Sequence, residues 1–99
     1  MRLQQLRDLL AVVSHGGYRA AARALGVSQA GLTKSLAKLE EEHGIVLLQR
    51  TSQGIALSAA GEEFVTYARA VLYEVDRAQA WLVRSRQPPV REGKVGGSV

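Results

Sequence analysis

Residues 18–39 read YRAAARALGVSQAGLTKSLAKL, which is two short helical patterns separated by the three residues Gly26, Val27 and Ser28. The first pattern is rich in alanine, so a neighbouring helix can approach closely, and Gly26 ends it. The second begins after Ser28, a favoured N-cap residue, and is expected to stop at Gly44. Two helices joined by a tight turn that contains glycine predict a helix-turn-helix. The apolar positions of the second helix are Leu32, Leu36 and Leu39.

The opposite face of this second helix is polar. In a helix-turn-helix the second helix enters the major groove of DNA with its N-terminus first. The amide of Gln29 suits the N6/N7 edge of adenine, Thr33 a thymine methyl group or a phosphate, and Lys34 guanine or a phosphate. An ordinary solvated face is the alternative interpretation. The spacing of the two helices favours a face that reads DNA.

A helix and a hairpin flank the motif. Residues 3–14 carry apolar side chains at helical spacing and are followed by two glycines. Residues 45–57 hold two short apolar runs around a turn that ends in Gly54, which predicts a small β-hairpin, or wing. A surface hairpin with no role in binding is the alternative. The wing side chains placed to reach a DNA backbone or minor groove are Arg50, Ser52 and Gln53.

A long helix is expected from Ser58, another N-cap residue, to about Gln87, before two prolines. Apolar residues recur along it at steps of four and three, which is a heptad seam. The seam could cover one side of a single domain, but a helix of about 30 residues is about 45 Å long and outruns a domain of this size. We therefore expect it to join two copies of the chain. The seam residues are Phe64, Ala68, Val71, Val75, Ala78 and Leu82.

The basic charge gathers in the N-terminal part of the chain. The 99 residues carry a net charge of +4, and residues 1–58 carry +3 of it, from seven basic and four acidic side chains. Such an excess favours an anionic partner such as DNA. We expect a DNA-binding domain over 1–58, a dimerisation helix over 59–87 and a hinge over 88–99. The acidic run 40–42 opposes DNA binding locally and is expected to be solvated.

Several classes of function find no support in the sequence. The chain has no cysteine, so disulfides and thiolate metal sites are excluded. His15 and His43 are far apart and lack partners at metal-ligand spacing. There is no phosphate-binding glycine loop, no nucleophile elbow, no signal peptide and no apolar run long enough to span a membrane. The sequence therefore predicts no enzyme, cofactor or metal, and leaves a coiled-coil interaction module with a basic helical head as an alternative to DNA binding.

In their order and spacing, six segments resemble the N-terminal domain of LysR-type transcriptional regulators. The resemblance covers about residues 1–87, and a winged-helix regulator of another family is the alternative. The segments are 3–13, 17–22, 25–29, 39–44, 47–51 and 57–62.

The resemblance implies a mainly α, winged helix-turn-helix protein of the bacterial cytoplasm. It implies linker helices that pair antiparallel in a homodimer, a tetramer for the full-length protein, and an interrupted palindrome as the DNA site. It also implies a C-terminal domain that binds a small-molecule effector. We expect that domain to lie beyond residue 99, since 93–98 resembles its first strand.

By position, the resemblance also assigns residue roles. Three positions depart from the family: Ala30 replaces a usual proline, Gly31 a usual alanine, and Gln53 a common arginine. The residues implied to contact bases are Gln29, Ala30, Thr33 and Lys34. Those implied to contact phosphates or the minor groove are Ser28, Ser35, Lys38, Arg50 and Gln53. Arg19, at a position that is often serine or threonine in the family, and Ser52 of the wing turn are further candidates for a phosphate contact.

Overall fold

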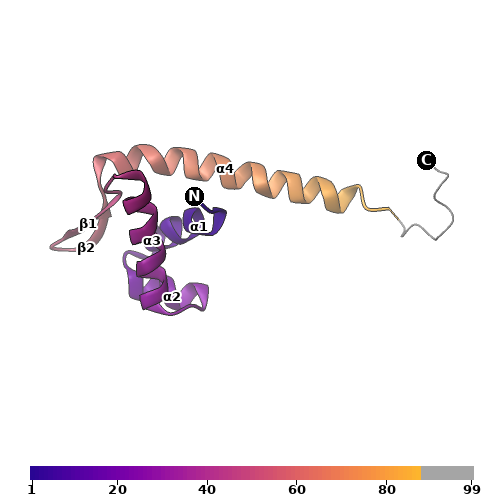
Figure 1. Ribbon diagram of the computed structural model, residues 1–99. Helices are drawn as coiled ribbons and strands as arrows, with labels where there is room; N and C mark the ends of the chain where they lie inside the picture. Colours follow the sequence, from indigo (N-terminus) through magenta and orange to yellow (C-terminus); the bar gives the residue numbers. More distant parts are fainter. Residues whose placement is uncertain (88–99) are drawn as a thin grey trace.

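The computed structural model describes residues 1–87, and it confirms a mainly α, winged helix-turn-helix fold with a long C-terminal helix (Figure 1). The expected hinge over 88–99 lies outside the described residues. Two antiparallel strands form the wing, with Leu48 opposite Leu57 and Thr51 opposite Gly54. The elements in chain order are α1 (Leu3–His15), α2 (Tyr18–Leu25), α3 (Gln29–His43), β1 (Leu48–Thr51), β2 (Gly54–Leu57) and α4 (Ala59–Arg84).

Local capping sets the helix-turn-helix geometry. Gly26 adopts a left-handed conformation with φ of 72°, which suits glycine, and so ends α2. The next amide, that of Val27, returns to the carbonyl oxygen of Ala22 at 3.0 Å. The Ser28 hydroxyl then accepts a hydrogen bond from Gly31 N at 3.0 Å and caps α3. The turn therefore follows from three successive residues, as the sequence predicts.

The core lies where α1, α2 and α3 meet beneath the start of α4. The three leucines expected on the apolar stripe of α3 are each 2% exposed, which confirms that face as the buried one. Because Val65 of α4 joins the same cluster, the first turns of α4 are part of the domain and not a separate stalk. The buried cluster consists of Leu9, Val12, Ala21, Ala22, Leu32, Leu36, Leu39, Leu47 and Val65.

The wing is shorter than expected, because its first strand begins at Leu48 and not at residue 45. The backbone groups before Leu48 have other partners. Ser58 Oγ donates to the carbonyl oxygen of Val46 at 2.6 Å, and Ser58 N donates to that of Leu47 at 2.9 Å. The same hydroxyl accepts from Gly61 N at 2.9 Å. Ser58 therefore caps α4 and ties its start to the segment before the wing.

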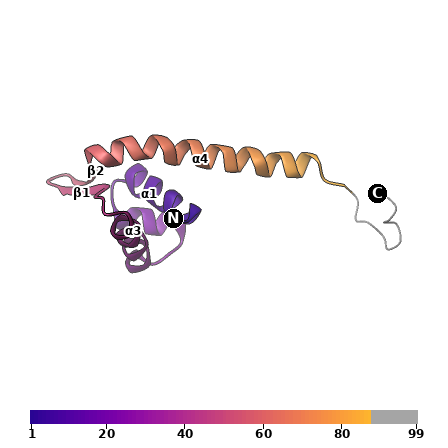
Figure 2. The ribbon, with the colours of Figure 1, turned by 45° about the horizontal axis from the view of Figure 1, so that its top comes forward.

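Helix α4 has 26 residues and extends well past the other helices (Figures 1 and 2). It ends at Arg84, three residues before the expected end at Gln87. The residue before a proline disfavours helical geometry, which fits an end of the helix ahead of Gln87. Within residues 1–87, none of the helices combines the length and the apolar character that a membrane span requires.

Candidate nucleic-acid interface

The side of α3 that faces away from the core presents the side chains expected to read bases. Gln29, Ala30, Thr33 and Lys34 are all exposed. At about 100° per residue, Ala30 and Lys34 lie opposite the buried leucines, and Thr33 lies about 90° from them. Gln29 lies only about 50° from the leucines and is exposed at the start of the helix. The structure thus brings the four residues together on the first two turns of α3, the part of the helix that a helix-turn-helix inserts into a groove.

A groove beside this face contains the two arginines expected to contact phosphates. Its lining comes from the start of α2, the start of α3 and the wing, and includes Tyr18, Arg19, Gln29, Arg50 and Ile55. Both arginines are exposed, so their guanidinium groups are free to bind an anion. Positive charge from α2 and from the wing therefore flanks the polar face of α3.

Tyr18 belongs to this groove although sequence reasoning did not single it out. Burial raises the pKa of its phenol, Glu40 raises the pKa further, and Arg50 opposes the rise. The phenol therefore stays protonated near neutral pH and can donate a hydrogen bond to an acceptor in the groove. An aromatic residue at the start of the alanine-rich helix, beside Arg19, was the available signal.

The turn of the wing presents the residues expected at the minor groove. Gln53 N donates to Thr51 Oγ1, and Thr51 Oγ1 donates to the carbonyl oxygen of Gly54, each at 3.1 Å. Ser52 and Gln53 are exposed at the tip, which projects away from the helices (Figure 1). A closed turn holds these two side chains at the end of the wing.

Two residues expected to contact phosphates are already engaged within the chain. Ser35 is half-buried, and its hydroxyl donates to Asp8 Oδ2 at 2.9 Å, so its only proton is not directed toward solvent. This geometry argues against the expected phosphate contact of Ser35. Lys38 Nζ lies 3.9 Å from Glu42 Oε2, but both side chains are largely exposed and such a pair is worth little. Lys38 therefore remains available to an anion.

Glu40 corrects the expectation that the acidic run is solvated throughout. Its Oε2 accepts hydrogen bonds from Leu47 N at 2.6 Å and from Leu48 N at 3.0 Å. Glu41 and Glu42 are exposed, as expected. The helical position of Glu40, one turn after the buried Leu36, was the signal that could have separated it from its neighbours. Glu40 thus connects α3 to the entry of the wing.

We predict that Glu40→Ala lowers the free energy of unfolding by about 1–3 kcal/mol, because two amides lose a charged acceptor. Urea denaturation measures this change. Glu41→Ala is the matched control, since it removes the same charge from the neighbouring exposed position. An equal loss of stability in both variants would show that the two hydrogen bonds do not hold the wing.

Many apolar residues of α4 fall into two stripes about 100° apart. An inner stripe of Gly61, Val65, Ala68 and Leu72 faces the chain's own domain, and Ala68 is only 1% exposed. Ala68 is therefore corrected from a seam residue to a core residue. Phe64 and Val75 lie between the stripes and are half-buried. The outer stripe is exposed and consists of Tyr67, Val71, Ala78 and Leu82.

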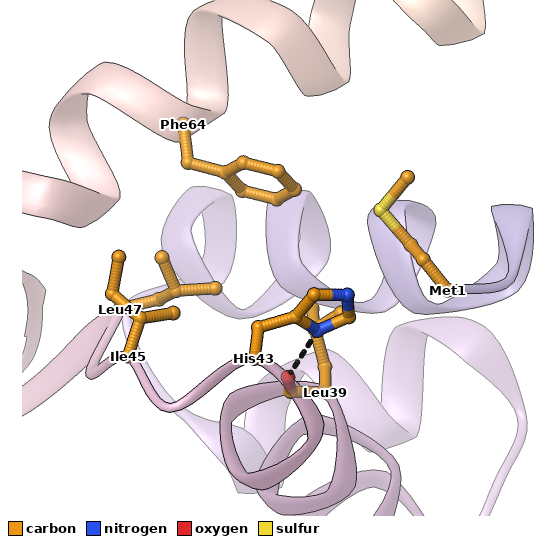
Figure 3. Close-up of a pocket in the computed structure, with 6 residues that line it drawn as sticks. All are labelled: Met1, Leu39, His43, Ile45, Leu47 and Phe64. Carbon is orange, nitrogen blue, oxygen red and sulfur yellow. Dashed lines mark hydrogen bonds between the residues drawn. The ribbon is translucent and has the colours of Figure 1, made fainter.

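An apolar pocket opens between Phe64 of α4 and the end of α3 (Figure 3). The phenyl ring points toward His43, whose Nδ1 lies 2.9 Å from the carbonyl oxygen of Leu39. The pocket has a volume of about 200 Å³. Since a cavity of about 150 Å³ accepts benzene, one large apolar side chain would fit. The lining residues are Met1, Leu39, His43, Ile45, Leu47 and Phe64.

A helix-turn-helix with a wing and a basic, polar outward face is typical of regulatory proteins that bind DNA. Comparisons with known proteins place the chain in the same class. Residues 3–62 match the family described as bacterial regulatory helix-turn-helix protein, lysR family. The HTH-type transcriptional regulator ClcR of Pseudomonas putida is 38% identical over 96 residues, which are 97% of this chain and 31% of that protein. A probable hydrogen peroxide-inducible genes activator of Streptomyces viridosporus is 45% identical over 73 residues, 74% of this chain and 23% of that protein. The chain belongs to the lysR family.

Solved structures agree with this assignment. A crystal structure of BenM DBD with benA site 1 DNA superposes with a TM-score of 0.81 at 35% identity, and covers 87% of this chain and 100% of that chain. A CbnR DBD–DNA complex gives a TM-score of 0.78 at 38% identity with the same coverage. The chain spans about a third or less of the length of the curated relatives cited above.

Proposed function

We propose that the chain is the sequence-specific, double-stranded DNA-binding domain of a LysR-type transcriptional regulator, with α3 in the major groove. The observation that carries the proposal is the continuity of the exposed face of α3 with the groove that contains Arg19 and Arg50. Polar side chains on a helix can read base edges, and arginines on either side can hold the phosphates. The two DNA complexes named above support this role, because the chain superposes on their protein component.

The role that we propose for each residue follows from its position on α3, on the wing or beside the groove. Gln29, Ala30, Thr33 and Lys34 contact base edges. The tip of the wing, with Ser52 and Gln53, follows the minor groove. Because neither wing-tip residue is basic, we expect minor-groove contacts to contribute little to affinity. The residues that contact phosphates are Arg19, Ser28, Lys38 and Arg50.

Selection of duplexes from a random-sequence library with the 99-residue chain tests the proposal. We expect an inverted repeat whose half-sites lie about one helical turn apart. Gln29→Ala or Thr33→Ala should lower affinity for the selected duplex by about 1–3 kcal/mol and relax the preference at one base step. Gln79→Ala and Thr66→Ala, at exposed positions of α4, are the matched controls. An equal loss of affinity for all sequences would mean that Gln29 and Thr33 do not read bases.

We further propose that α4 joins two copies of the chain in antiparallel orientation. The outer stripe supplies an apolar surface, and the charges suit this direction, since Glu62 and Glu63 lie near the start of α4 and Arg84 near its end. In a pairing centred near residue 73, Leu82 of the partner subunit would lie beside Phe64 and the pocket of Figure 3. A two-fold axis makes this contact twice.

The remaining proposals concern the longer protein. The division into 1–58, 59–87 and 88–99 follows the sequence pattern, but the first turns of α4 pack on the helix-turn-helix core, so we propose that the DNA-binding domain includes the start of α4. We propose an effector-binding domain beyond residue 99. We also propose assembly as a tetramer, action in the bacterial cytoplasm and a purely regulatory, non-catalytic role. The lengths of the curated relatives, which are named as regulators and activators, support a longer protein of this kind.

A further inference from the structure

A small, partly buried polar network joins α1 to α3. The Ser35 hydroxyl donates to Asp8 Oδ2 at 2.9 Å, and Gln4 Nε2 donates to Asp8 Oδ1 at 3.0 Å. Gln5 Nε2 donates to the carbonyl oxygen of Ser35 at 3.1 Å, and Gln5 Oε1 accepts from Arg2 N at 2.8 Å. Asp8 and Gln5 are 6% and 4% exposed. Asp8 therefore holds the side chain of Ser35, and Gln5 holds its backbone carbonyl group.

This network supplies a directional constraint that the aliphatic core lacks. Burial of leucines favours contact between α1 and α3 but has no preferred direction. A hydrogen bond weakens steeply when its angle departs from linearity. An aliphatic side chain at position 8 could fill the same space, whereas only an acceptor can hold the Ser35 hydroxyl. The network thus adds a directional constraint on the rotation of α3 to the burial of its leucines.

A rotation of α3 about its axis displaces its exposed side chains, because their ends lie farthest from that axis. A rotation of about 20° moves a side-chain tip by about 2 Å, which is enough to break a hydrogen bond. Lys34 is adjacent to Ser35 in the chain, and Thr33 is two residues away. A change in the orientation of Ser35 therefore moves both of the central base-reading side chains.

We infer that Asp8 and Ser35 form a positioning pair that sets the register of Thr33 and Lys34 on the bases, and that Ser35 is not a phosphate ligand. This inference rests on the proposed DNA-binding function. Asp8 lies on α1, away from the exposed face of α3, and it acts only through Ser35. Asp8 and Ser35 affect the difference in affinity between DNA sequences more than they affect the sequence-independent affinity for the DNA backbone.

A double-mutant cycle tests the inference. Asp8→Ala, Ser35→Ala and the double variant are measured in the 99-residue chain against a duplex recovered by selection and a scrambled duplex of the same composition. We expect each single variant to lose about tenfold in affinity for the selected duplex and less than about twofold for the scrambled one. The double variant should lose about tenfold and not a hundredfold, because the two residues act as one unit.

Conservative and control variants separate positioning from charge and from folding. Asp8→Asn retains an acceptor for the Ser35 hydroxyl and should restore most of the discrimination. Ser14→Ala and Asp76→Asn make the same changes at exposed positions and should have no effect. Circular dichroism gives the temperature at which each variant unfolds. Binding is measured well below that temperature, where the variant is folded. If Asp8→Ala does not fold, Ser35→Ala must still lose discrimination while Asp8→Asn retains most of it, which keeps the inference testable.

Other outcomes would overturn the inference. If Ser35→Ala weakens binding to both duplexes and lowers the salt dependence by about one phosphate contact, while Asp8→Ala does not, Ser35 is a phosphate ligand. If the single variants behave like the wild type, or if their losses multiply in the double variant, the two residues are not a positioning pair. A wild-type chain that does not distinguish the two duplexes would instead contradict the proposed function itself, and the inference with it.

Discussion

Val71→Glu should convert the dimer proposed for α4 into a monomer and lower the affinity of the chain for a two-half-site duplex by about 100-fold or more. Val71 is 38% exposed and lies in the middle of the outer stripe of α4. In an antiparallel pair centred near residue 73, the new carboxylate would be buried against the partner's apolar side chains without a cation. Loss of the dimer removes the second half-site contact, which is otherwise made at high effective concentration.

Sedimentation equilibrium and binding to one-half-site and two-half-site duplexes measure this prediction. Ala80→Glu adds the same charge on the opposite, exposed side of α4 and should leave the dimer intact. Affinity for a single half-site should be similar in Val71→Glu and Ala80→Glu, because neither residue is proposed to touch DNA. A dimer mass that is unchanged by Val71→Glu would contradict the proposed interface.

Gly61→Ala should lower the free energy of unfolding by about 1–3 kcal/mol, although alanine is the better helix former. A Cβ at this position would overlap the carbonyl oxygen of Leu47 and lie 2.9 Å from Leu57 Cδ2. The first of these is a backbone atom, so relief requires α4 to move off the wing. Such a movement also weakens the Ser58 cap, which accepts from Gly61 N at 2.9 Å.

The matched control for this prediction is Gly31→Ala on α3. A Cβ there meets only the Ser28 hydroxyl, at 2.9 Å, which is the end of a side chain. We expect a change within about 1 kcal/mol, with helix propensity in its favour. Urea midpoints and m-values give both free energies. If Gly61→Ala is as stable as Gly31→Ala, the close approach of α4 to the segment before the wing is not a constraint on the fold.

The helix-turn-helix could be predicted from sequence because its signals are local. Ser28 caps α3 with its own side chain, and Gly26 ends α2 with its own backbone conformation. The bounds of α2 and α3 therefore match the sequence pattern. The outward position of Ala30 and Lys34 follows from the same helical period that buries the leucines, whereas Gln29 lies close to the leucine stripe and is exposed at the N-terminal end of α3.

Features that depend on contacts distant in sequence could not be predicted. Glu40 resembles its acidic neighbours until the wing entry folds back onto it, and this contact also delays the first strand to Leu48. The heptad pattern of α4 gives a spacing but does not say which stripe the chain's own domain covers, so Ala68 was misplaced. Asp8 and Ser35 are 27 residues apart, and each is an ordinary polar residue until α1 and α3 meet.

The central claim is that the exposed face of α3 reads a DNA sequence, and equilibrium binding across a salt series tests it most directly. The 99-residue chain is titrated with a duplex recovered by selection and with a scrambled duplex of equal length and composition. We expect tighter binding to the selected duplex at every salt concentration, with log affinity falling linearly with log salt by about 0.9 per phosphate contact. Equal affinity for the two duplexes would contradict sequence reading, and the absence of any salt-dependent binding would favour a coiled-coil interaction module instead.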